Sequence, residues 1–339
     1  MKVFVFLTLF ISVTLFAKVD YRFFPKNTTI MGYVATKGMM KNPQIKEYMK
    51  RPDVQQSMKT LLSMGVDIKK LGAISFYSNA DSLIGKDSKA IKKDGNYAII
   101  LHGLNLENLI KSEMKKNKDA KSMKYKGYTV YLKLEAEDGK KKVDAVTFIE
   151  GNTVMGSVPG VKNVIDAYKG KRFANKKLVN SLLKKLNNPD FFVIDLVDAK
   201  QRQLILQSLK AKKNDPTVAM LGLENISKNL ELLVFAGKII KDRIYLYAGL
   251  QSDKGAVKIF INNTNMQFNA FKPMLAQQVN AYKPMLGNDG AIELNSILNS
   301  IKFEAQNKLG LMSLFINLKR VSKALKKMNT QVPNLNIGK

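Results

Sequence analysis

The chain has 339 residues and a formal net charge of +29, from 56 Lys and Arg against 27 Asp and Glu. It contains no Cys and one His, which excludes disulfide scaffolds, thiolate metal sites, cysteine nucleophiles and multi-histidine metal centres. A hydrophobic content of 45% is typical of a folded chain, and the length suits about two domains. We therefore expect a folded, basic protein without a cofactor or a metal site.

The N-terminus has the pattern of a secretory signal peptide. Lys2 precedes an apolar stretch at 3–16, which is shorter than the roughly 20 residues of a membrane-spanning helix. Ala17 is the small residue that precedes cleavage, so 1–17 is predicted to be removed. Leu15 is bulkier than the residue usual at its position, which leaves an uncleaved N-terminal anchor as the alternative. We expect export to the periplasm or cell surface of a bacterium, with no transmembrane span in the mature chain.

Apolar periodicity and Gly and Pro punctuation predict the elements that follow the leader. Pro43 and Pro52 are each expected near the start of a helix, and Gly65 is expected to end the second one. Asn105 is expected to cap a further helix. The predicted strands are 29–35, 71–77, 97–102, 128–134, 143–149 and 153–158, followed by a helix at 161–168.

The remainder of the chain shows similar signals. Asp198 is predicted to cap a helix that contains Leu204 and Leu209, and a longer helical pattern covers 256–275. The predicted strands are 191–197, 230–235, 244–248, 300–305 and 311–316, with a short helix before them at 178–186 and a last one at 321–328.

Both parts of the chain are interpreted as strand-helix-strand-strand-helix-strand-strand-helix, an order that contains a ferredoxin-like core. The expected fold is therefore α+β, with two similar halves at 18–175 and 176–339. The first half carries 30 basic and 16 acidic groups and the second 25 and 11, so each contributes +14. Two unrelated α+β domains are the alternative, because residue identity between the halves is slight.

Three segments carry a resemblance to a known group of proteins. They are YKGYTVY at 125–131, VTFIEGNTVMGS at 146–157 and the predicted helix at 161–168. This pattern is similar to that of exported bacterial proteins of unknown function, in which "Y-x-G-x-x-x-Y" precedes "A-x-x-x-D-G-x-x-V-x-G-S" and a helix. Here Glu150 and Asn152 flank the glycine where the pattern usually has Asp-Gly. The resemblance implies an exported, duplicated α+β body and supplies no catalytic residues.

Two residues are candidates for catalysis, His102 and Asp195. His102 ends a predicted strand, but no local motif supplies the nucleophile and carboxylate that a catalytic histidine needs, so a structural role is favoured. Asp195 lies in mid-strand, where it is either a buried acid or, as we favour, a solvent-facing one. The loop at 156–160 lacks the Lys-Ser/Thr of a phosphate-binding loop and is predicted to be a Ser-capped helix start.

The densest basic run lies within 111–126, with smaller groups at 169–177 and 319–327. Lys outnumbers Arg fifty to six and the charge is spread over both halves, which disfavours nucleic acid as a partner. Anionic envelope lipid or an acidic polymer is the preferred partner, and general lysine-rich solvation is the alternative. The candidate binding residues are Lys115, Lys116, Lys118, Lys121, Lys124 and Lys126.

These observations favour a non-enzymatic envelope protein that binds an anionic lipid or polymer or a partner protein, or that self-associates in a structural role. The alternative is a carboxylate-based hydrolase or transferase of the envelope. That activity requires Asp195 and His102 to converge on one cleft.

Overall fold

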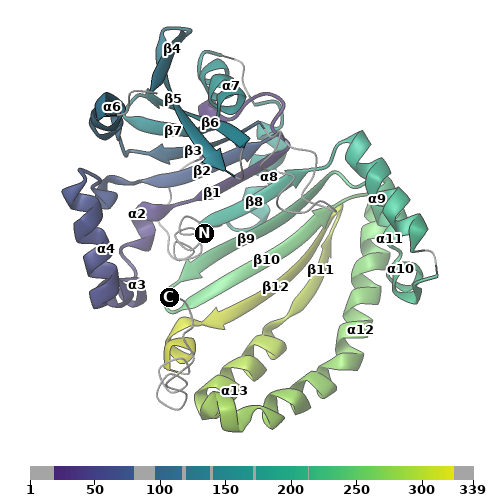
Figure 1. The fold of residues 1–339 in the computed structure, drawn as a ribbon. Coiled ribbons are helices and arrows are strands. Elements are labelled where there is room, and N and C mark those ends of the chain that lie inside the picture. Colours follow the sequence, from purple (N-terminus) through teal and green to yellow (C-terminus); the bar gives the residue numbers. More distant parts are fainter. Residues whose placement is uncertain are drawn as a thin grey trace. The chain divides into compact units, whose positions relative to one another are not determined.

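The computed structural model describes residues 19–79, 96–116, 120–137, 140–170, 173–212 and 214–323 (Figure 1). The fold is α+β, as expected, with helices beside antiparallel strands. The chain divides into two compact units, Met1–Leu196 and Val197–Lys339. The domain boundary expected between 175 and 176 stays a prediction, because compactness alone does not identify a folding domain.

The sheet of unit 1 has the strand order β8-β1-β2-β3-β7-β6-β5-β4. Every neighbouring pair in it is antiparallel. Two-residue turns join β4 to β5 and β6 to β7, and their first residues, Lys126 and Glu150, have positive φ and precede Gly. The strands are β1 Ile30–Val34, β2 Ala73–Ser78, β3 Tyr97–His102, β4 Lys121–Tyr125, β5 Tyr128–Glu137, β6 Lys140–Ile149, β7 Asn152–Ser157 and β8 Phe191–Leu196.

One face of this sheet forms the main core of unit 1. Cross-strand neighbours on this face are fully buried, such as Tyr77 opposite Ala98 and Ile100 opposite Val154. The helix α7 (Val158–Tyr168) packs on β3, β5, β6 and β7 and against the short helix η1 (Tyr21–Phe23). The helix α8 (Lys176–Lys185) joins this layer, because Tyr21 of η1 donates a hydrogen bond to Asn180.

The opposite face of unit 1 carries a smaller cluster near β2 and β3. Val66, Ile68, Leu71 and Leu104 are buried there, and partly buried side chains from the strands and helices pack around them. Short helices supply much of this layer. They are α2 (Thr36–Met39), α3 (Pro43–Met49), α4 (Pro52–Ser63), η2 (Ile68–Lys70) and α6 (Glu107–Lys116).

Unit 2 contains four strands in the order β11-β12-β10-β9, again antiparallel. Asp198 caps α9 with a complete capping box, in which the Asp198 carboxylate accepts from the Gln201 backbone N–H and Gln201 Oε1 accepts from the Asp198 backbone N–H. The strands are β9 Leu232–Ile240, β10 Arg243–Gln251, β11 Lys302–Gln306 and β12 Leu309–Asn317, and the first three helices are α9 Ala199–Ala211, α10 Pro216–Leu221 and α11 Leu223–Lys228.

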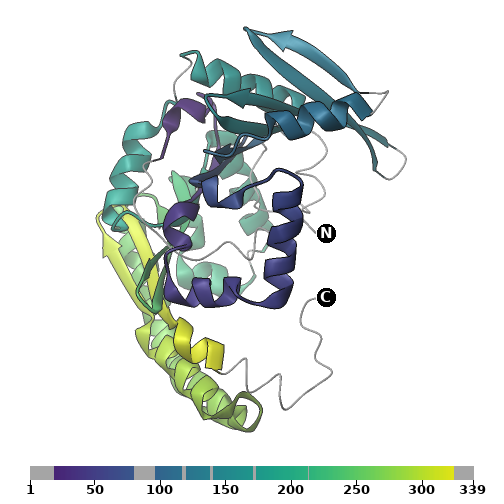
Figure 2. The same ribbon diagram turned by 90° about the vertical axis from the view of Figure 1, so that its left-hand side faces the viewer.

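Two long helices, α12 (Lys254–Ala281) and α13 (Lys283–Ser300), connect β10 to β11. Val257 and Ile261, near the start of α12, pack on partly buried side chains of the sheet. Beyond that point α12 leaves the sheet, and α13 returns to it (Figures 1 and 2). Pro273 lies inside α12, and Gly287 in α13 has a non-helical backbone that kinks the helix. We call residues 254–300 the helical arch.

Most of the predicted elements are confirmed, including both proline-initiated helices and the Asn105 and Asp198 caps. The predicted helix at 321–328 is only partly within the described residues, where helix covers 318–323. The sequence did not reveal α2, β4, α10, α11, α13 or the short helices η1 and η2. The strand β4 lies at the edge of the sheet, and its polar, lysine-rich sequence does not have the apolar pattern from which a strand is predicted.

The strand pairing of a ferredoxin-like core is absent from the described part of unit 1. A ferredoxin-like sheet places a third strand between the two strands that flank its first helix. Here β1 pairs directly with β2, with Ile30 opposite Ser78, and β2 pairs with β3. The order of elements along a chain does not determine their pairing. A crossover helix joins parallel strands, whereas β1 and β2 are antiparallel, and the connection between them, which holds several helices, returns the chain to the adjacent position.

Candidate functional site

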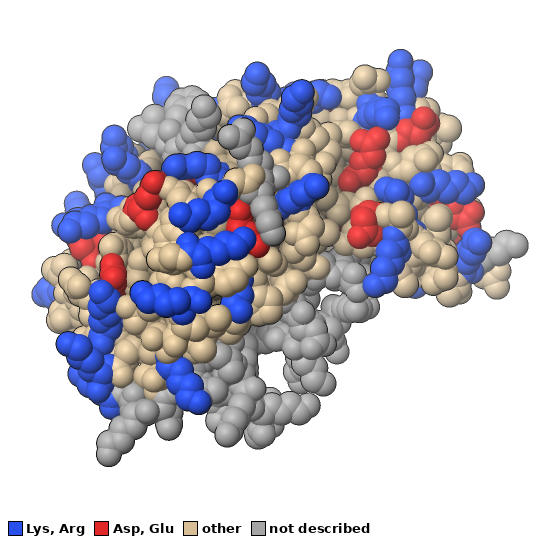
Figure 3. Space-filling view, turned by 90° about the horizontal axis from the view of Figure 1, so that it is seen from above, with Lys and Arg blue, Asp and Glu red and all other residues tan. Residues whose placement is uncertain are grey.

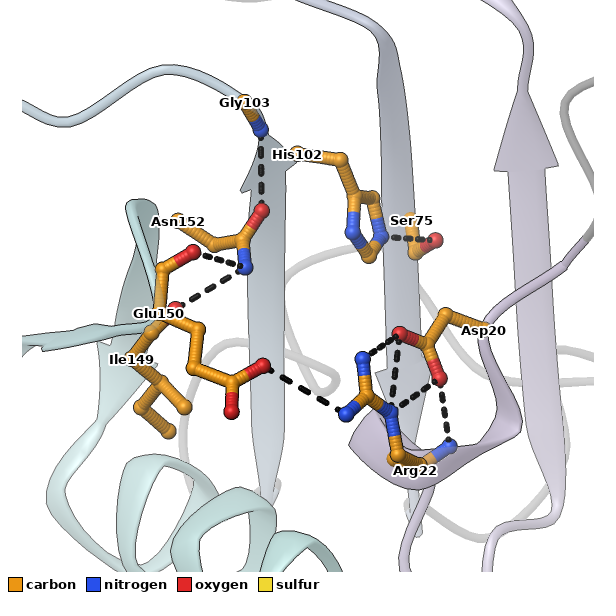
Figure 4. A network of polar contacts seen from close by, with 8 residues as sticks. All are labelled: Asp20, Arg22, Ser75, His102, Gly103, Ile149, Glu150 and Asn152. Carbon is orange, nitrogen blue, oxygen red and sulfur yellow. Dashed lines mark hydrogen bonds and ion pairs between the residues drawn. The ribbon is translucent and has the colours of Figure 1, made fainter.

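His102 belongs to a polar network at one end of the unit 1 sheet (Figure 4). Its Nε2 lies 2.8 Å from Ser75 Oγ on β2, and its ring contacts Phe23 edge-on, with ring centroids 5.3 Å apart. Asp20 caps η1 and holds the Arg22 guanidinium through a 2.8 Å ion pair. The network therefore ties η1 to the ends of β2 and β3.

The turn between β6 and β7 extends this network. Arg22 Nη1 lies 3.4 Å from Glu150 Oε2. The Asn152 side chain accepts from Gly103 N at 2.8 Å and donates to the carbonyls of Ile149 and Glu150. The side-chain amide of Asn152 can donate and accept at once, as these contacts require.

Burial and the charge of Arg22 determine which groups of the network are ionised. Burial lowers the pKa of His102 to about 4, against the opposing effect of the Asp20 carboxylate. Burial raises the pKa of Asp20, but the hydrogen bonds and charge of Arg22 outweigh it and leave this pKa below its usual value. The hydrogen bond with Glu150 raises the pKa of Tyr168 to about 12. At neutral pH the imidazole is neutral and Asp20 is charged.

Ser75, His102 and Asp20 bring a hydroxyl, an imidazole and a carboxylate into one region, but not as a nucleophilic triad. The Ser75 side chain is 0% exposed and faces the core of the sheet. The Asp20 carboxylate is engaged by Arg22 through both of its oxygens instead of orienting the imidazole. A substrate carbonyl has no access to the Ser75 hydroxyl, so the geometry suits a structural role for His102.

Asp195 is buried in β8, with 7% of its surface exposed, so the favoured solvent-facing interpretation was wrong. Its backbone lies opposite Ile30, and the register continues through Ser78 to Tyr97 of β3. His102 is five residues farther along β3, which places the two candidates roughly 20 Å apart at about 4.8 Å per strand and 3.3 Å per residue. The structure therefore does not bring the two candidate catalytic residues together.

The loop at 156–160 is the start of α7, as predicted. Ser157 Oγ accepts a hydrogen bond from Gly160 N at 3.1 Å, and Pro159 lies in the first turn. Tyr77 donates to the Gly160 carbonyl, and a Cβ at Gly160 would lie 1.9 Å from the Tyr97 carbonyl oxygen. This helix N-terminus is packed against β3 and leaves no room for a phosphate.

The candidate lysines fall on different elements. Lys116 pairs with Glu113 at 2.8 Å, Lys126 pairs with Asp166, and Lys124 donates to Thr129 Oγ1. Lys121 and Lys124 are three residues apart on β4 and so point to opposite faces of the strand. Lys115 and Lys116 end α6, Lys126 occupies the β4–β5 turn, and Lys118 lies outside the described residues. Their part in binding stays a prediction.

A different set of cations is organised around tyrosine rings near α7. Lys162 Nζ lies 5.2 Å from the Tyr125 ring centroid, and Lys169 Nζ lies 5.2 Å from that of Tyr128. At these separations the negative face of the ring attracts the cation. Three further cations lie over tyrosine rings in the same way: Lys126 over Tyr125, Arg22 over Tyr168 and Lys176 over Tyr21. We call these five cations and four rings the tyrosine–cation surface.

The parts of this surface are adjacent in unit 1. The Tyr125 hydroxyl donates to Asp166 of α7, which also pairs with Lys126. The Phe23 and Tyr168 rings are in contact, with centroids 5.5 Å apart, and η1 packs on α7. Among the described residues, Lys162, Lys169 and Lys176 have no carboxylate within ion-pair distance. The sequence did not predict this surface, because every cation except Lys126 lies over a ring from a distant segment.

A view from above shows Lys and Arg distributed over the visible face with fewer Asp and Glu among them (Figure 3). The cations do not merge into a single dense patch in this view. Local geometry, rather than total charge, therefore distinguishes one basic region from another. No group of three or more metal-ligating side chains occurs among the described residues. Within the same residues, no helix has both the length and the apolarity to cross a membrane.

The chain matches no protein-family model and no curated protein. Solved structures titled crystal forms I, III and IV of TP0453 are similar over 92%, 92% and 91% of this chain and 98%, 100% and 97% of theirs. Their sequence identities are 10%, 8% and 9%, with TM-scores of 0.38, 0.36 and 0.34. These values fall below the level at which a common fold is assigned.

Proposed function

We propose that the protein is a non-enzymatic envelope protein that binds phosphate- or carboxylate-bearing lipids or polymers through the tyrosine–cation surface. The observation that carries this proposal is the set of ammonium groups placed over tyrosine rings without carboxylate partners. Lys162, Lys169 and Lys176 have this arrangement.

The physical reason is preorganisation. A free lysine side chain loses about 2 kcal/mol of rotamer entropy when it is fixed, which weakens an ordinary surface contact. A ring beneath the ammonium restricts the side chain before a ligand arrives. The ammonium has three N–H donors, and those directed away from the ring can make charge-assisted hydrogen bonds to an anionic oxygen.

The proposal includes export through the leader at 1–17, with cleavage near Ala17. The positive Lys2, the apolar stretch and the small residue support it. The test is the N-terminal sequence of the protein recovered from the envelope of a bacterial host. A chain that begins at Lys18 supports cleavage, whereas a chain that retains Lys2 supports the uncleaved anchor.

We also propose that the two halves are copies of one structural plan. In unit 1 the β2–β3 pair is followed by α6 and a meander, whose last strand, β7, returns to pair with β3. In unit 2 the β9–β10 pair is followed by the helical arch and a hairpin, whose last strand, β12, returns to pair with β10. This shared connectivity supports an internal duplication.

The binding proposal is tested by sedimentation with vesicles that contain anionic phospholipid and, separately, by retention on an acidic polysaccharide. The triple change Lys162→Gln, Lys169→Gln and Lys176→Gln should weaken vesicle binding by about 100-fold, since each lysine near an anionic surface contributes on the order of 1 kcal/mol. Binding of the unchanged protein should also fall steeply as salt is added.

The matched control changes three exposed lysines of unit 2, Lys210, Lys212 and Lys258, to Gln. It removes the same charge and should leave most of the binding intact. Equal losses in the two triple variants would show that total charge, not the tyrosine–cation surface, determines binding. The two ligands distinguish a lipid headgroup from a polymer as the natural source of the anion.

A further inference from the structure

The helical arch exposes an unusual amount of apolar surface. Eight of the fourteen large hydrophobic side chains that are exposed among the described residues lie on it. Met266 is 63% exposed, Met285 is 66% exposed and Tyr282 is 58% exposed. Ile259 and Met266 are seven residues apart on α12, on the side opposite the buried Val257 and Ile261. Aromatic residues and Met are enriched at protein interfaces.

The middle of the same segment is nearly free of charge. Residues 259–288 contain two charged side chains, Lys272 and Lys283, in a chain that is 24% charged overall. Asn and Gln take the place of charge, as at Asn262, Asn265, Gln277 and Gln278. An exposed helix that only needs to be solvated is normally rich in Lys and Glu, so this composition indicates a surface that becomes covered.

We propose that the helical arch is the surface through which two copies of this chain associate. Two molecules that both carry this large excess of cations repel one another, and the repulsion is weakest where both contribute few cations. A two-fold contact also joins a patch to itself, so its polar groups must be self-complementary. Side-chain amides meet this condition because each one both donates and accepts, whereas lysines cannot pair with lysines.

The dimensions of the arch suit such a contact. With 28 residues, α12 is about 42 Å long at 1.5 Å per residue. A stable interface takes about 800 Å² and roughly 20–30 residues from each partner. The exposed apolar side chains of the arch extend from Ile259 to Leu294, a span that can supply this number.

A lipid surface is the competing occupant, and the composition disfavours it. Helices that lie in a membrane interface carry Lys and Arg on their polar face to engage headgroups. The arch has two cations in the thirty residues where its apolar side chains are concentrated. The proposed anion-binding surface is in the other unit, so the two proposals are independent and can fail separately.

The first test is sedimentation equilibrium of the purified protein over a range of concentrations. We expect a monomer–dimer equilibrium, and the double change Ile259→Glu and Met266→Glu should weaken it at least tenfold. The matched control is Leu62→Glu with Met64→Glu, which alters two exposed apolar side chains of unit 1 and should leave the dimer unchanged. A strict monomer at all concentrations, or equal weakening by both double variants, would overturn the proposal.

The absence of Cys permits a second test. Met266→Cys introduces a single thiol, and a two-fold contact across the arch places the two copies of this thiol near one another. A short bismaleimide should then link Met266→Cys chains into covalent dimers at low protein concentration, and Leu62→Cys chains should remain monomeric. Equal yields from both would contradict the proposed surface.

Vesicles of zwitterionic phospholipid decide between the two occupants. We expect the unchanged protein to bind these vesicles no more strongly than the variant that carries both Ile259→Glu and Met266→Glu. Binding that this variant loses, together with a monomer in solution, would replace the second copy with a lipid surface as the partner of the arch. We expect each variant to fold, because all of the altered side chains are exposed. Circular dichroism melting checks this expectation.

Discussion

The imidazole of His102 lies between the buried Ser75 hydroxyl and the ring of Phe23, and this environment determines its charge. A pKa of about 4 in the folded protein, against an ordinary value of 6.5, means that the unfolded chain binds more protons between these pH values. The contribution of His102 to stability is therefore complete above about pH 6.5 and is lost as the pH falls toward 4.

This behaviour gives a prediction for His102→Gln. The gap between the two pKa values corresponds to at most about 3 kcal/mol. Between pH 7 and pH 4.5, the free energy of unfolding of the unchanged protein should fall further than that of the variant, by about 2 kcal/mol. Urea unfolding at the two pH values measures both quantities. Parallel losses would mean that other groups account for the acid sensitivity.

At the residue scale the sequence predicted the His102 environment better than that of Asp195. A histidine without a nearby nucleophile motif is most simply a structural one, and its contacts suit that role. The orientation of Asp195 was beyond prediction, because in a sheet packed on both faces neither direction of alternation leads to solvent. Phe191 and Phe192, neighbours on opposite faces of β8, are both buried.

Among the elements, α7 depends on how closely its first turn approaches β3. Ala usually stabilises a helix relative to Gly, but a Cβ at Gly160 would lie 1.9 Å from the Tyr97 carbonyl oxygen. Gly160→Ala should therefore destabilise the protein by about 2 kcal/mol or more, because backbone atoms have to move. The measurement is the urea midpoint.

The matched control for this change is Gly72→Ala. A Cβ there would meet the His102 carbonyl oxygen at 3.5 Å, an ordinary contact. We expect this variant to lie within about 1 kcal/mol of the unchanged protein. A Gly160→Ala protein as stable as the control would show that α7 can shift without cost.

Elements with strong local signals were predictable, and those defined by distant partners were not. Pro52 and Asp198 mark helix starts through backbone chemistry that acts within a few residues. The strand β4 and the helix α13 have no such signal. The five residues of β4 include two lysines and pair with β5, and α13 depends on contact with α12 and β12. The tyrosine–cation surface was missed for the same reason, since its rings and cations come from separate segments.

At the scale of the whole molecule, the pairing of β8 with β1 bears on where the first half of the chain ends. It pairs with β1 at five positions, from Ile30 opposite Asp195 to Val34 opposite Phe191. A fragment that ends at 175 lacks this strand and also α8, whose Val179 and Leu182 are buried. We therefore expect fragment 19–196 to be more stable than fragment 19–175.

Thermal unfolding of the two fragments tests this expectation. The longer one should unfold cooperatively at a higher temperature, and the shorter one should aggregate because β1 becomes an unpaired edge. If fragment 19–175 is equally stable and soluble, the boundary expected from the sequence is the better description of the folding domain.

The return of β7 to β3 has a consequence for the order in which the chain acquires its structure. When a chain emerges N-terminus first, β2 and β3 can form their hairpin early, but the other edge of β3 has no partner until Asn152–Ser157 has followed. The strands β4 to β7 pair with one another in chain order, and hairpins of this kind form in microseconds. Synthesis or secretion, rather than the conformational search, would then limit the rate at which this sheet closes. During that interval the open edge of β3, together with the edge of β1 that later pairs with β8, is exposed to mispairing or to recognition by a chaperone.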